Sequence, residues 1–374
     1  MKRILALSVS AGAGHVRAAQ ALVAAAAAGG EVEVIHADVL DFVPTAFRRL
    51  YGEFYLDLVG RHPHLWAYLY DLSDHAPRQG WFSRMRRAVE RVNTRALHAH
   101  IRAQAPDAIV CTHFLPAELL ARRIAHGEPL PPVWVQVTDY DVHRLWVQPG
   151  MRGYLVAADE TASRLRGLLP DAPRIAVTGI PVMPPFAQAH DRAACAQRHG
   201  LDPARTTALV MTGGAGIASG AAMVERLLAI GGDLQIVALA GRNADLLAGY
   251  QRLAAAHPQR LHAIGYTSAV DELMACADVA VTKPGGLSIS ECLAMGLPMI
   301  LIAPIPGQEL RNAHHLLEQG AALLALDAAA LEYRIGRLLH EPELAARLRA
   351  RCHALRRPDA ARRVLEEVLA DGAR

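Results

Sequence analysis

Residues 279–291 read VAVTKPGGLSISE, and this stretch indicates the fold more clearly than any other part of the chain. Its first four residues are apolar or β-branched, which is the composition of a short buried strand. The Lys-Pro-Gly-Gly turn ends the strand, and apolar residues at helical spacing follow it. A strand, a glycine turn and a helix in this order are typical of an α/β domain with a parallel sheet.

Short apolar segments alternate with longer Ala/Leu/Arg segments at helical period along the whole chain. We expect one set of strands at residues 4–8, 32–37, 108–111, 133–137, 154–156 and 175–178, and a second set at residues 208–212, 235–240, 261–264, 279–282, 299–302 and 322–326. Residues 179–185 contain three prolines, which suppress helix and favour an extended connector between the sets. The pattern therefore predicts the α/β class with two sheets in two domains.

The predicted organisation has an N-terminal domain at residues 1–178, with an insertion at about residues 42–102. A linker at residues 179–190 leads to a C-terminal domain at residues 191–355. The helical segment 356–374 is expected to pack back toward the first domain. Ligands of such sheets bind at the carboxyl ends of the strands, so we expect a central cleft that both domains face.

Each half opens with a strand, a glycine-rich turn and a helix, at residues 10–15 (SAGAGH) and 212–216 (TGGAG). Glycine lets the backbone approach an anion, and a helix N-terminus offers unpaired N–H groups and partial positive charge. Such turns also use glycine for purely steric reasons, so one turn alone does not decide between the two explanations. The duplication of the turn favours phosphate binding.

The composition describes a packed globular protein, with 52% hydrophobic and 20% charged residues among 374. The net charge of +3 gives no reason to expect a nucleic-acid partner. The five cysteines are widely spaced and lack a Cys-x-x-Cys pair, so we expect reduced thiols and neither a zinc nor a redox site. The alanine-rich stretch at residues 18–28 is too short to cross a bilayer, and we expect no membrane-spanning segment.

The turn at residues 283–286 suits a diphosphate, and Glu291 lies one to two helical turns beyond it, where it can accept hydrogen bonds from ribose hydroxyls. Gln308 and Glu309, in the next polar loop, can reach sugar hydroxyls. The chain uses arginine almost everywhere, yet Lys283 stands beside this turn. The alternative is an ordinary capped helix with a surface glutamate.

Residues 265–321 resemble the C-terminal domain of the glycosyltransferase family that includes the peptidoglycan lipid-intermediate N-acetylglucosaminyltransferase. The closest resemblance is to its branch of monogalactosyldiacylglycerol synthases and processive diacylglycerol glucosyltransferases. Residues 8–19 (SVSAGAGHVRAA), 137–143 (VTDYDVH) with Trp146, and 178–182 (TGIPV) resemble the same branch. Four short motifs in the correct order, spread over nearly the full chain, make the resemblance specific.

The resemblance implies two Rossmann-like domains of the GT-B type, a UDP-sugar held mainly by the second domain, and a lipid acceptor approached through the first. It places Gly214 and Gly216 near the diphosphate, Gly265 and Tyr266 near the uracil, Glu291 on the ribose, and Gln308 and Glu309 on the donor sugar, with Lys283, Gly285, Gly286 and Asn312 in the same donor site. Gly14, His143 and Trp146 fall on the acceptor side. Ala13 and Arg144 depart from the branch pattern, and Arg144 leaves the shape of the acceptor loop open.

Sugar transfer needs a base for the acceptor hydroxyl and stabilisation of the departing diphosphate. His15, at the mouth of the first domain, is the first candidate base; packing or capping of the first helix is the other explanation for it. Asp139 is the alternative base, or orients the histidine or the acceptor hydroxyl. Asp139 and Asp141 resemble the metal-binding Asp-x-Asp of another glycosyltransferase fold, but we expect no metal and no cofactor, because glycine-loop amides replace the cation.

In the insertion, aromatic residues alternate with an excess of arginine over acidic residues. Trp81, Phe82, Arg84, Arg86 and Arg87 are the candidates for docking on an anionic membrane, because aromatic rings favour the headgroup level and arginines attract anionic lipid. For most of the aromatic residues at 51–70, ordinary core packing is the favoured explanation.

The sequence therefore predicts an inverting hexosyltransferase that moves glucose or galactose from its UDP-sugar to a lipid, with diacylglycerol favoured by the resemblance. The enzyme is expected to associate peripherally with the cytoplasmic face of the membrane. The alternatives are a transferase with another lipid-linked acceptor and a UDP-sugar epimerase on the same fold.

Overall fold

The computed structural model describes the 374-residue chain apart from residues 11, 44–94, 170–172, 213–219 and 372–374. The chain divides into two compact units. Unit 1 contains Met1–Pro184, Ile305–Arg311 and Asp359–Arg374, and unit 2 contains Pro185–Pro304 and Asn312–Pro358. Each unit is built on one six-stranded parallel sheet. The predicted α/β class with two sheets is therefore confirmed.

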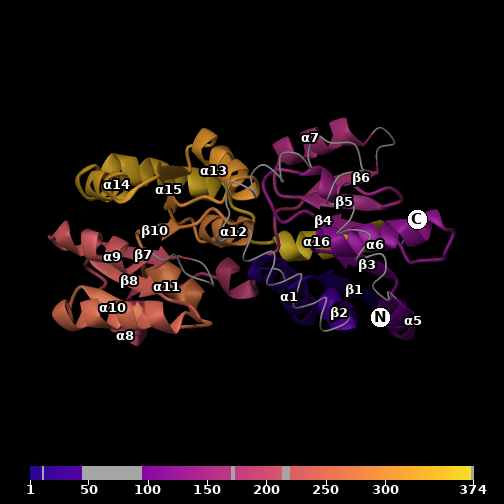
Figure 1. Cartoon of the computed structure of the whole chain (residues 1–374), viewed down its shortest axis with the longest axis horizontal. Coiled ribbons are helices and arrows are strands. Elements are labelled where there is room, and N and C mark those ends of the chain that lie inside the picture. Colours follow the sequence, from indigo (N-terminus) through magenta and orange to yellow (C-terminus); the bar gives the residue numbers. More distant parts are fainter. Residues whose placement is uncertain (11, 44–94, 170–172, 213–219, 372–374) are drawn as a thin grey trace. The chain divides into compact units, whose positions relative to one another are not determined.

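The sheet of unit 1 has the strand order β2-β1-β3-β4-β5-β6, and its outer strands can be followed in Figure 1. Its strands are β1 (Lys2–Ser8), β2 (Val32–Asp38), β3 (Ala108–Cys111), β4 (Val133–Gln136), β5 (Gly153–Val156) and β6 (Arg174–Val177). Its helices are α1 (Ala13–Gly29), α5 (Arg95–Gln104), α6 (Phe114–Ala125), α7 (Asp159–Leu168) and α16 (Ala360–Asp371), with 3-10 turns η1 (Val39–Phe42) and η2 (Arg144–Trp146).

Strand β1 shows why this sheet needs helices on both faces. Ile4 and Ala6 point into one core, which α1 and α16 cover, whereas Leu5 and Leu7 point into a second core on the other face. All four side chains are fully buried, as expected for a central parallel strand. Helix α16 thus joins unit 1 although it is the last element of the chain (Figure 1).

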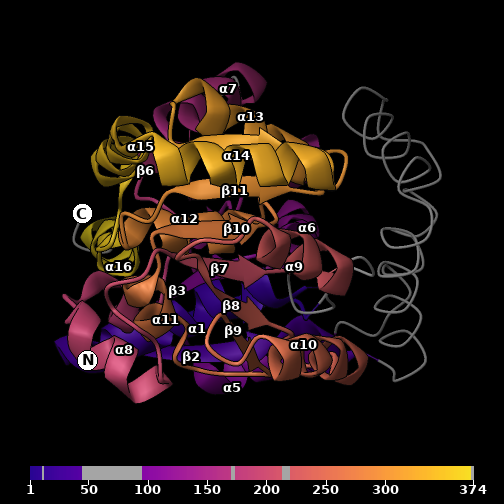
Figure 2. The same cartoon turned by 90° about the vertical axis from the view of Figure 1, so that its left-hand side faces the viewer.

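The sheet of unit 2 has the order β12-β11-β10-β7-β8-β9, and Figure 2 labels all of these strands except β12. Its strands are β7 (Thr207–Met211), β8 (Gln235–Leu239), β9 (Leu261–Ile264), β10 (Val279–Thr282), β11 (Met299–Ile302) and β12 (Ala322–Ala325). Its helices are α8 (Arg192–His199), α9 (Gly220–Ala229), α10 (Ala244–Ala256), α11 (Val270–Cys276), α12 (Gly286–Ala294), α14 (Ala328–His340) and α15 (Pro342–Leu355). The 3-10 turn η3 (Pro184–Ala187) and helix α13 (Gln308–Glu318) each contain residues of both units.

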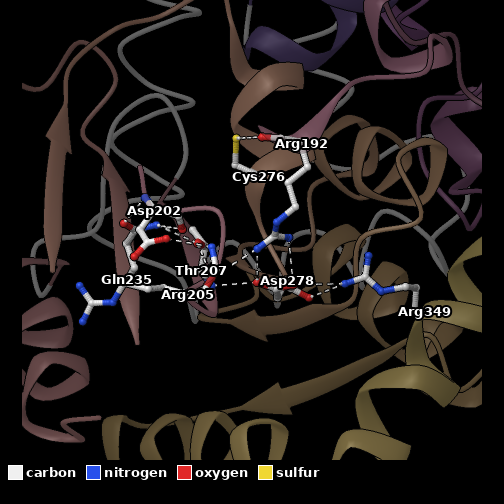
Figure 3. Close-up of polar contacts among 9 residues, drawn as sticks. Arg192, Asp202, Arg205, Thr207, Gln235, Cys276, Asp278 and Arg349 are labelled. Atoms are coloured by element: carbon white, nitrogen blue, oxygen red, sulfur yellow. Dashed lines mark hydrogen bonds and ion pairs between the residues drawn. The ribbon is translucent and has the colours of Figure 1, made fainter. Parts of the chain in front are cut away.

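A carboxylate network fastens the amino ends of the two middle strands of this sheet. Asp278 immediately precedes β10, and its two oxygens accept hydrogen bonds from the Arg192 guanidinium at 3.0 and 2.8 Å (Figure 3). It also accepts from the Thr207 backbone N–H at 2.9 Å, and Arg349 lies 3.8 Å away. One side chain therefore connects β7, β10, α8 and α15.

The state of the cysteines agrees with the sequence prediction. All five cysteines are free and buried, and burial raises the pKa of Cys276 to about 11, so these thiols are neutral core groups. Within the described part of the chain, no helix combines the length and the apolar character that crossing a membrane requires.

We expect Asp278→Ala to lower the free energy of unfolding by about 1–2 kcal/mol, because hydrogen bonds to a charged group are strong but this one is partly exposed to water. Urea unfolding of the full chain measures the change. The matched control is Glu332→Ala, since Glu332 pairs with Arg226 at the surface of the same unit, and we expect this variant to lose much less stability than Asp278→Ala. Equal losses in the two variants would mean that the network does not stabilise the sheet.

Candidate active site

Loops from three adjacent strands of unit 1 meet at the carboxyl edge of the sheet. The loop after β1 leads into α1, whose first turn contains His15. Thr112 and His113 follow β3, and Thr138 follows β4. Because β1, β3 and β4 are neighbours in the sheet, these residues converge although His15 and Thr138 are 123 positions apart in the chain.

The His15 ring is held at its Nδ1 atom. Nδ1 lies 2.9 Å from the Thr112 carbonyl oxygen and 2.9 Å from the Thr138 hydroxyl oxygen. In turn, the Thr112 hydroxyl donates to the His15 carbonyl at 2.9 Å, so Thr112 holds both the ring and the backbone of His15. These contacts leave Nε2 as the ring nitrogen that can act on a substrate.

Aromatic side chains surround this histidine. The His113 ring packs edge-on against His15 with centroids 4.5 Å apart, and the Trp146 ring lies 6.2 Å away. His113 Nδ1 accepts the Leu115 N–H, which caps α6. His143 caps η2 in the same way through the Leu145 N–H, so the turn that begins at Arg144 is a regular capped element.

The apolar surroundings determine the charge of the two packed histidines. Desolvation lowers the pKa of His15 from 6.5 to about 4, against a smaller raising effect of the Thr112 carbonyl. Burial lowers the pKa of His113 well below its ordinary value, and the neighbouring His15 lowers it further. Both imidazoles are therefore neutral at physiological pH, the state in which His15 can accept a proton.

The two aspartates of the Asp-x-Asp pattern differ in their surroundings. Asp141 accepts from Arg164 at 3.1 Å and from Arg311 at 2.9 Å, both assigned to unit 1, so two guanidinium groups compensate its charge. Asp139 is half-buried and directly follows Thr138. The Nδ1 atom of His15, which a carboxylate would have to reach to orient the ring, is bonded to Thr112 and Thr138.

Two helices start after a glycine and have no side-chain cap; α7, α11 and α15 also have no side-chain cap, but acidic residues stand in their first turns. Gly12 precedes α1 with φ 113°, a conformation that glycine tolerates, and Gly285 precedes α12. Neither helix has a capping side chain or an acidic residue in its first turn. By contrast, Asp191, Asn243 and Asp327 cap α8, α10 and α14. Uncapped N–H groups at a helix start suit an anionic ligand.

In unit 2 the predicted donor residues follow the ends of strands. Lys283, Gly285 and Gly286 form the turn after β10, and Glu291 lies in α12 with only 8% of its surface exposed. Asn312 is fully buried, and its amide donates to the Pro284 carbonyl at 3.1 Å, so it holds the turn.

Gly265 and Tyr266 follow β9. Tyr266 is 64% exposed, and the Arg242 guanidinium lies 4.9 Å from the centre of its ring. Gln308 and Glu309 begin α13, where Glu309 accepts the Ile305 N–H at 2.8 Å. The Gln308 side-chain oxygen is buried, with no hydrogen-bond partner among the described residues.

Some predicted site residues lie outside the described residues: Gly214, Gly216, Trp81, Phe82, Arg84, Arg86 and Arg87. Of the others, Gly14 lies in the first turn of α1 beside His15, and Trp146 packs near the His15 ring. Sequence reasoning missed Thr112, Thr138, His113 and Arg242. The only sign of these residues in the sequence is their position, because each closely follows a predicted strand.

Comparison with known proteins identifies the class of protein to which the chain belongs. Residues 15–182 match the model of the monogalactosyldiacylglycerol (MGDG) synthase family, and residues 207–364 match the glycosyltransferase family 28 C-terminal domain. Two α/β units with a glycine turn leading into α1 and another leading into α12 are the architecture of a GT-B glycosyltransferase. The chain is therefore a glycosyltransferase that combines an MGDG synthase domain with a family 28 C-terminal domain.

Individual relatives agree with this assignment. The processive diacylglycerol beta-glucosyltransferase of Bacillus pumilus is 28% identical over 279 residues, which cover 75% of this chain and 72% of the relative. The crystal structure of Acinetobacter baumannii MurG has a TM-score of 0.62 at 15% identity, covering 99% of this chain and 100% of MurG. The UDP-GlcNAc 2-epimerase of Neisseria meningitidis has a TM-score of 0.61 at 13% identity, covering 99% and 100%. At these identities the two structures show the fold alone.

We expect His15 to stay neutral down to about pH 5 and to titrate near its lowered pKa of about 4. The unfolded chain binds this proton more readily than the folded one, so the stability contributed by neutral His15 is complete above pH 6.5 and is lost as pH falls toward 4. NMR titration of the histidine rings, with His15→Gln to assign the signal, measures it. Titration of His15 at its ordinary 6.5 would contradict the desolvated site.

Proposed function

We propose that the protein transfers a hexose from UDP-glucose or UDP-galactose to a lipid acceptor, diacylglycerol, at the cytoplasmic face of the membrane, with inversion at the anomeric carbon. The observation that carries the proposal is the neutral His15 ring, anchored through Nδ1 at the carboxyl edge of the sheet of unit 1. A base held in this way is what activation of an alcohol requires.

Most of the residues proposed to hold the donor belong to unit 2, whereas Gln308 lies in the segment 305–311 of unit 1. The uncapped start of α12 and the turn at Lys283 offer backbone N–H groups and positive charge to the diphosphate. The Glu291 carboxylate lies about one and a half helical turns further on and accepts the ribose hydroxyls. Tyr266, largely exposed beside Arg242, offers an aromatic face to the uracil. Gln308 brings a buried, unpartnered carbonyl oxygen that suits a sugar hydroxyl.

The transfer is a single displacement. His15 Nε2 takes the proton of the acceptor hydroxyl while the oxygen forms a bond to the anomeric carbon. The bond from that carbon to the diphosphate oxygen breaks on the opposite side, and UDP leaves with the electron pair. Attack opposite the leaving group inverts the anomeric centre. The amides and the lysine at the α12 turn stabilise the negative charge that develops on the diphosphate, so no metal and no cofactor is needed.

The acceptor is inferred from relatives. Processive diacylglycerol beta-glucosyltransferases are similar to this chain over most of its length, which favours diacylglycerol as acceptor and glucose as the transferred sugar. The fold likeness to a UDP-GlcNAc 2-epimerase keeps a non-transferring enzyme as the alternative. A UDP-release assay that crosses UDP-glucose, UDP-galactose and UDP-N-acetylglucosamine with diacylglycerol and total membrane lipid separates them. Lipid-dependent release of UDP is expected, and its absence would reject the transferase.

We expect His15→Ala to lower turnover about 10²–10⁴-fold with unchanged affinity for UDP, because a general base acts in the transition state. Glu291→Ala is the matched variant and should show the opposite pattern, weakening UDP binding by roughly 1.5–3 kcal/mol. Turnover in the UDP-release assay and calorimetry with UDP measure the two effects. A chelator should leave the wild-type rate unchanged. Near-normal turnover of His15→Ala would move the role of base to Asp139.

We expect the combined change of Arg84, Arg86 and Arg87 to glutamine to reduce partitioning to anionic vesicles roughly a hundredfold, since each arginine near the surface contributes about 1 kcal/mol. Co-sedimentation with anionic and neutral vesicles measures it, and high salt should imitate the variant because the attraction is screened. The control changes Arg347, Arg356 and Arg357, which are exposed on unit 2. Equal sedimentation of both triple variants would remove the docking role from residues 81–87.

A further inference from the structure

We propose that Thr138 is a positioning residue for the transfer reaction: its hydroxyl oxygen and the Thr112 carbonyl together hold His15 as the Nδ1–H tautomer and steady the imidazolium that forms when Nε2 takes the acceptor proton. The inference rests on the proposed function in one respect only, the role of His15 as base. The tautomer itself follows from geometry that is independent of any substrate.

The tautomer is fixed by what each atom can donate. A carbonyl oxygen has no proton, so its 2.9 Å contact with His15 Nδ1 is a hydrogen bond only if Nδ1 carries the hydrogen. The Thr138 hydroxyl oxygen, also 2.9 Å from Nδ1, must then accept from the same N–H. Nε2 is left with the lone pair, the arrangement that a general base needs.

Two other histidines of this region, His113 and His143, favour the opposite tautomer. Nδ1 of His113 and Nδ1 of His143 accept backbone N–H groups, from Leu115 and Leu145 respectively. A neutral ring that accepts at Nδ1 carries its hydrogen on Nε2. Of these three histidines, His15 is thus the one whose backbone contacts select a basic Nε2.

Thr138 and Thr112 contribute differently. The Thr112 hydroxyl donates to the His15 and Leu7 carbonyls, so the Thr112 side chain contacts the backbone. Only the backbone carbonyl of Thr112 contacts the His15 ring. The Thr138 side chain is 5% exposed and meets the ring directly. Replacement of Thr138 therefore removes one acceptor from the His15 Nδ1–H group and leaves the contacts of the Thr112 hydroxyl with the backbone in place.

The chemical reason for two acceptors lies in the charge that develops during the reaction. As Nε2 takes the acceptor proton, the ring becomes positive and its Nδ1–H becomes a stronger donor. The two oxygens then stabilise a charge that is absent before the step, which lowers the barrier and not the free energy of the bound substrate. UDP leaves with its electron pair, and the imidazolium later returns its proton to water.

The test compares Thr138→Val with Thr138→Ser in the full chain. We expect the valine variant to lower kcat about ten- to a hundredfold, the range for losing a hydrogen bond to a charged group, with UDP affinity within about twofold of wild type. Serine keeps the hydroxyl and should restore most of the rate. The control is Thr161→Val: Thr161 is a buried threonine of the same unit whose hydroxyl donates to the Tyr140 carbonyl, and this variant should turn over like wild type.

A spectroscopic measurement tests the tautomer of His15 independently of enzyme activity. Ring ¹⁵N shifts of wild type, assigned with His15→Gln, should show His15 with the hydrogen on Nδ1. A hydrogen on Nε2 would overturn the proposal, as would unchanged kcat in Thr138→Val, or equal losses in the serine, valine and Thr161→Val variants. If wild type transferred no hexose to any lipid, the proposed function would fail, while the ring shifts would still decide how His15 is held.

Discussion

Every strand of both sheets runs parallel to its neighbours, and the arrangement of the site depends on this constraint. Parallel strands need a crossover on each connection, and the crossovers must cover both faces because the strands are buried on both. The turns that leave the strands therefore gather at one edge of each sheet. In unit 1 this places His15 against Thr112 and Thr138, which follow two different strands. The amino ends carry the structural groups instead, as Asp278 shows in unit 2.

The histidine site uses neutral acceptors where a carboxylate would be the common choice. A carboxylate on Nδ1 would raise the pKa of the ring and favour its charged form. A backbone carbonyl and a hydroxyl select the tautomer with much less stabilisation of the cation, and the aromatic surroundings of His113 and Trp146 oppose charging further. The site thus keeps His15 neutral as the resting state. The carboxylate of Asp141, which follows Thr138 closely in the chain, accepts hydrogen bonds from two arginines.

Much of the fold and part of the site could be predicted from the sequence, because those features are local. Each predicted strand overlaps an observed one, and the glycine turns located α1 and α12 and with them His15 and Glu291. Thr112 and Thr138 could not be found in this way. A single threonine after a strand has no local pattern, and its role arises only when β1, β3 and β4 are placed side by side. The contact by which Asn312, a predicted donor-site residue, donates its buried amide to the Pro284 carbonyl likewise has no local pattern in the sequence.

The starts of α1 and α12 differ from those of the other helices whose caps are described. Side chains cap α8, α10 and α14, and acidic residues stand in the first turns of α7, α11 and α15, which have no side-chain cap. At α1 and α12 the cap position is glycine, although Ser, Thr, Asp or Asn would stabilise the helix by roughly a few tenths of a kcal/mol. An internal cap would compete with an anionic ligand for the same N–H groups, and a glycine at the cap position avoids that competition. The two glycine caps therefore agree with the proposal that the donor diphosphate binds at the start of α12.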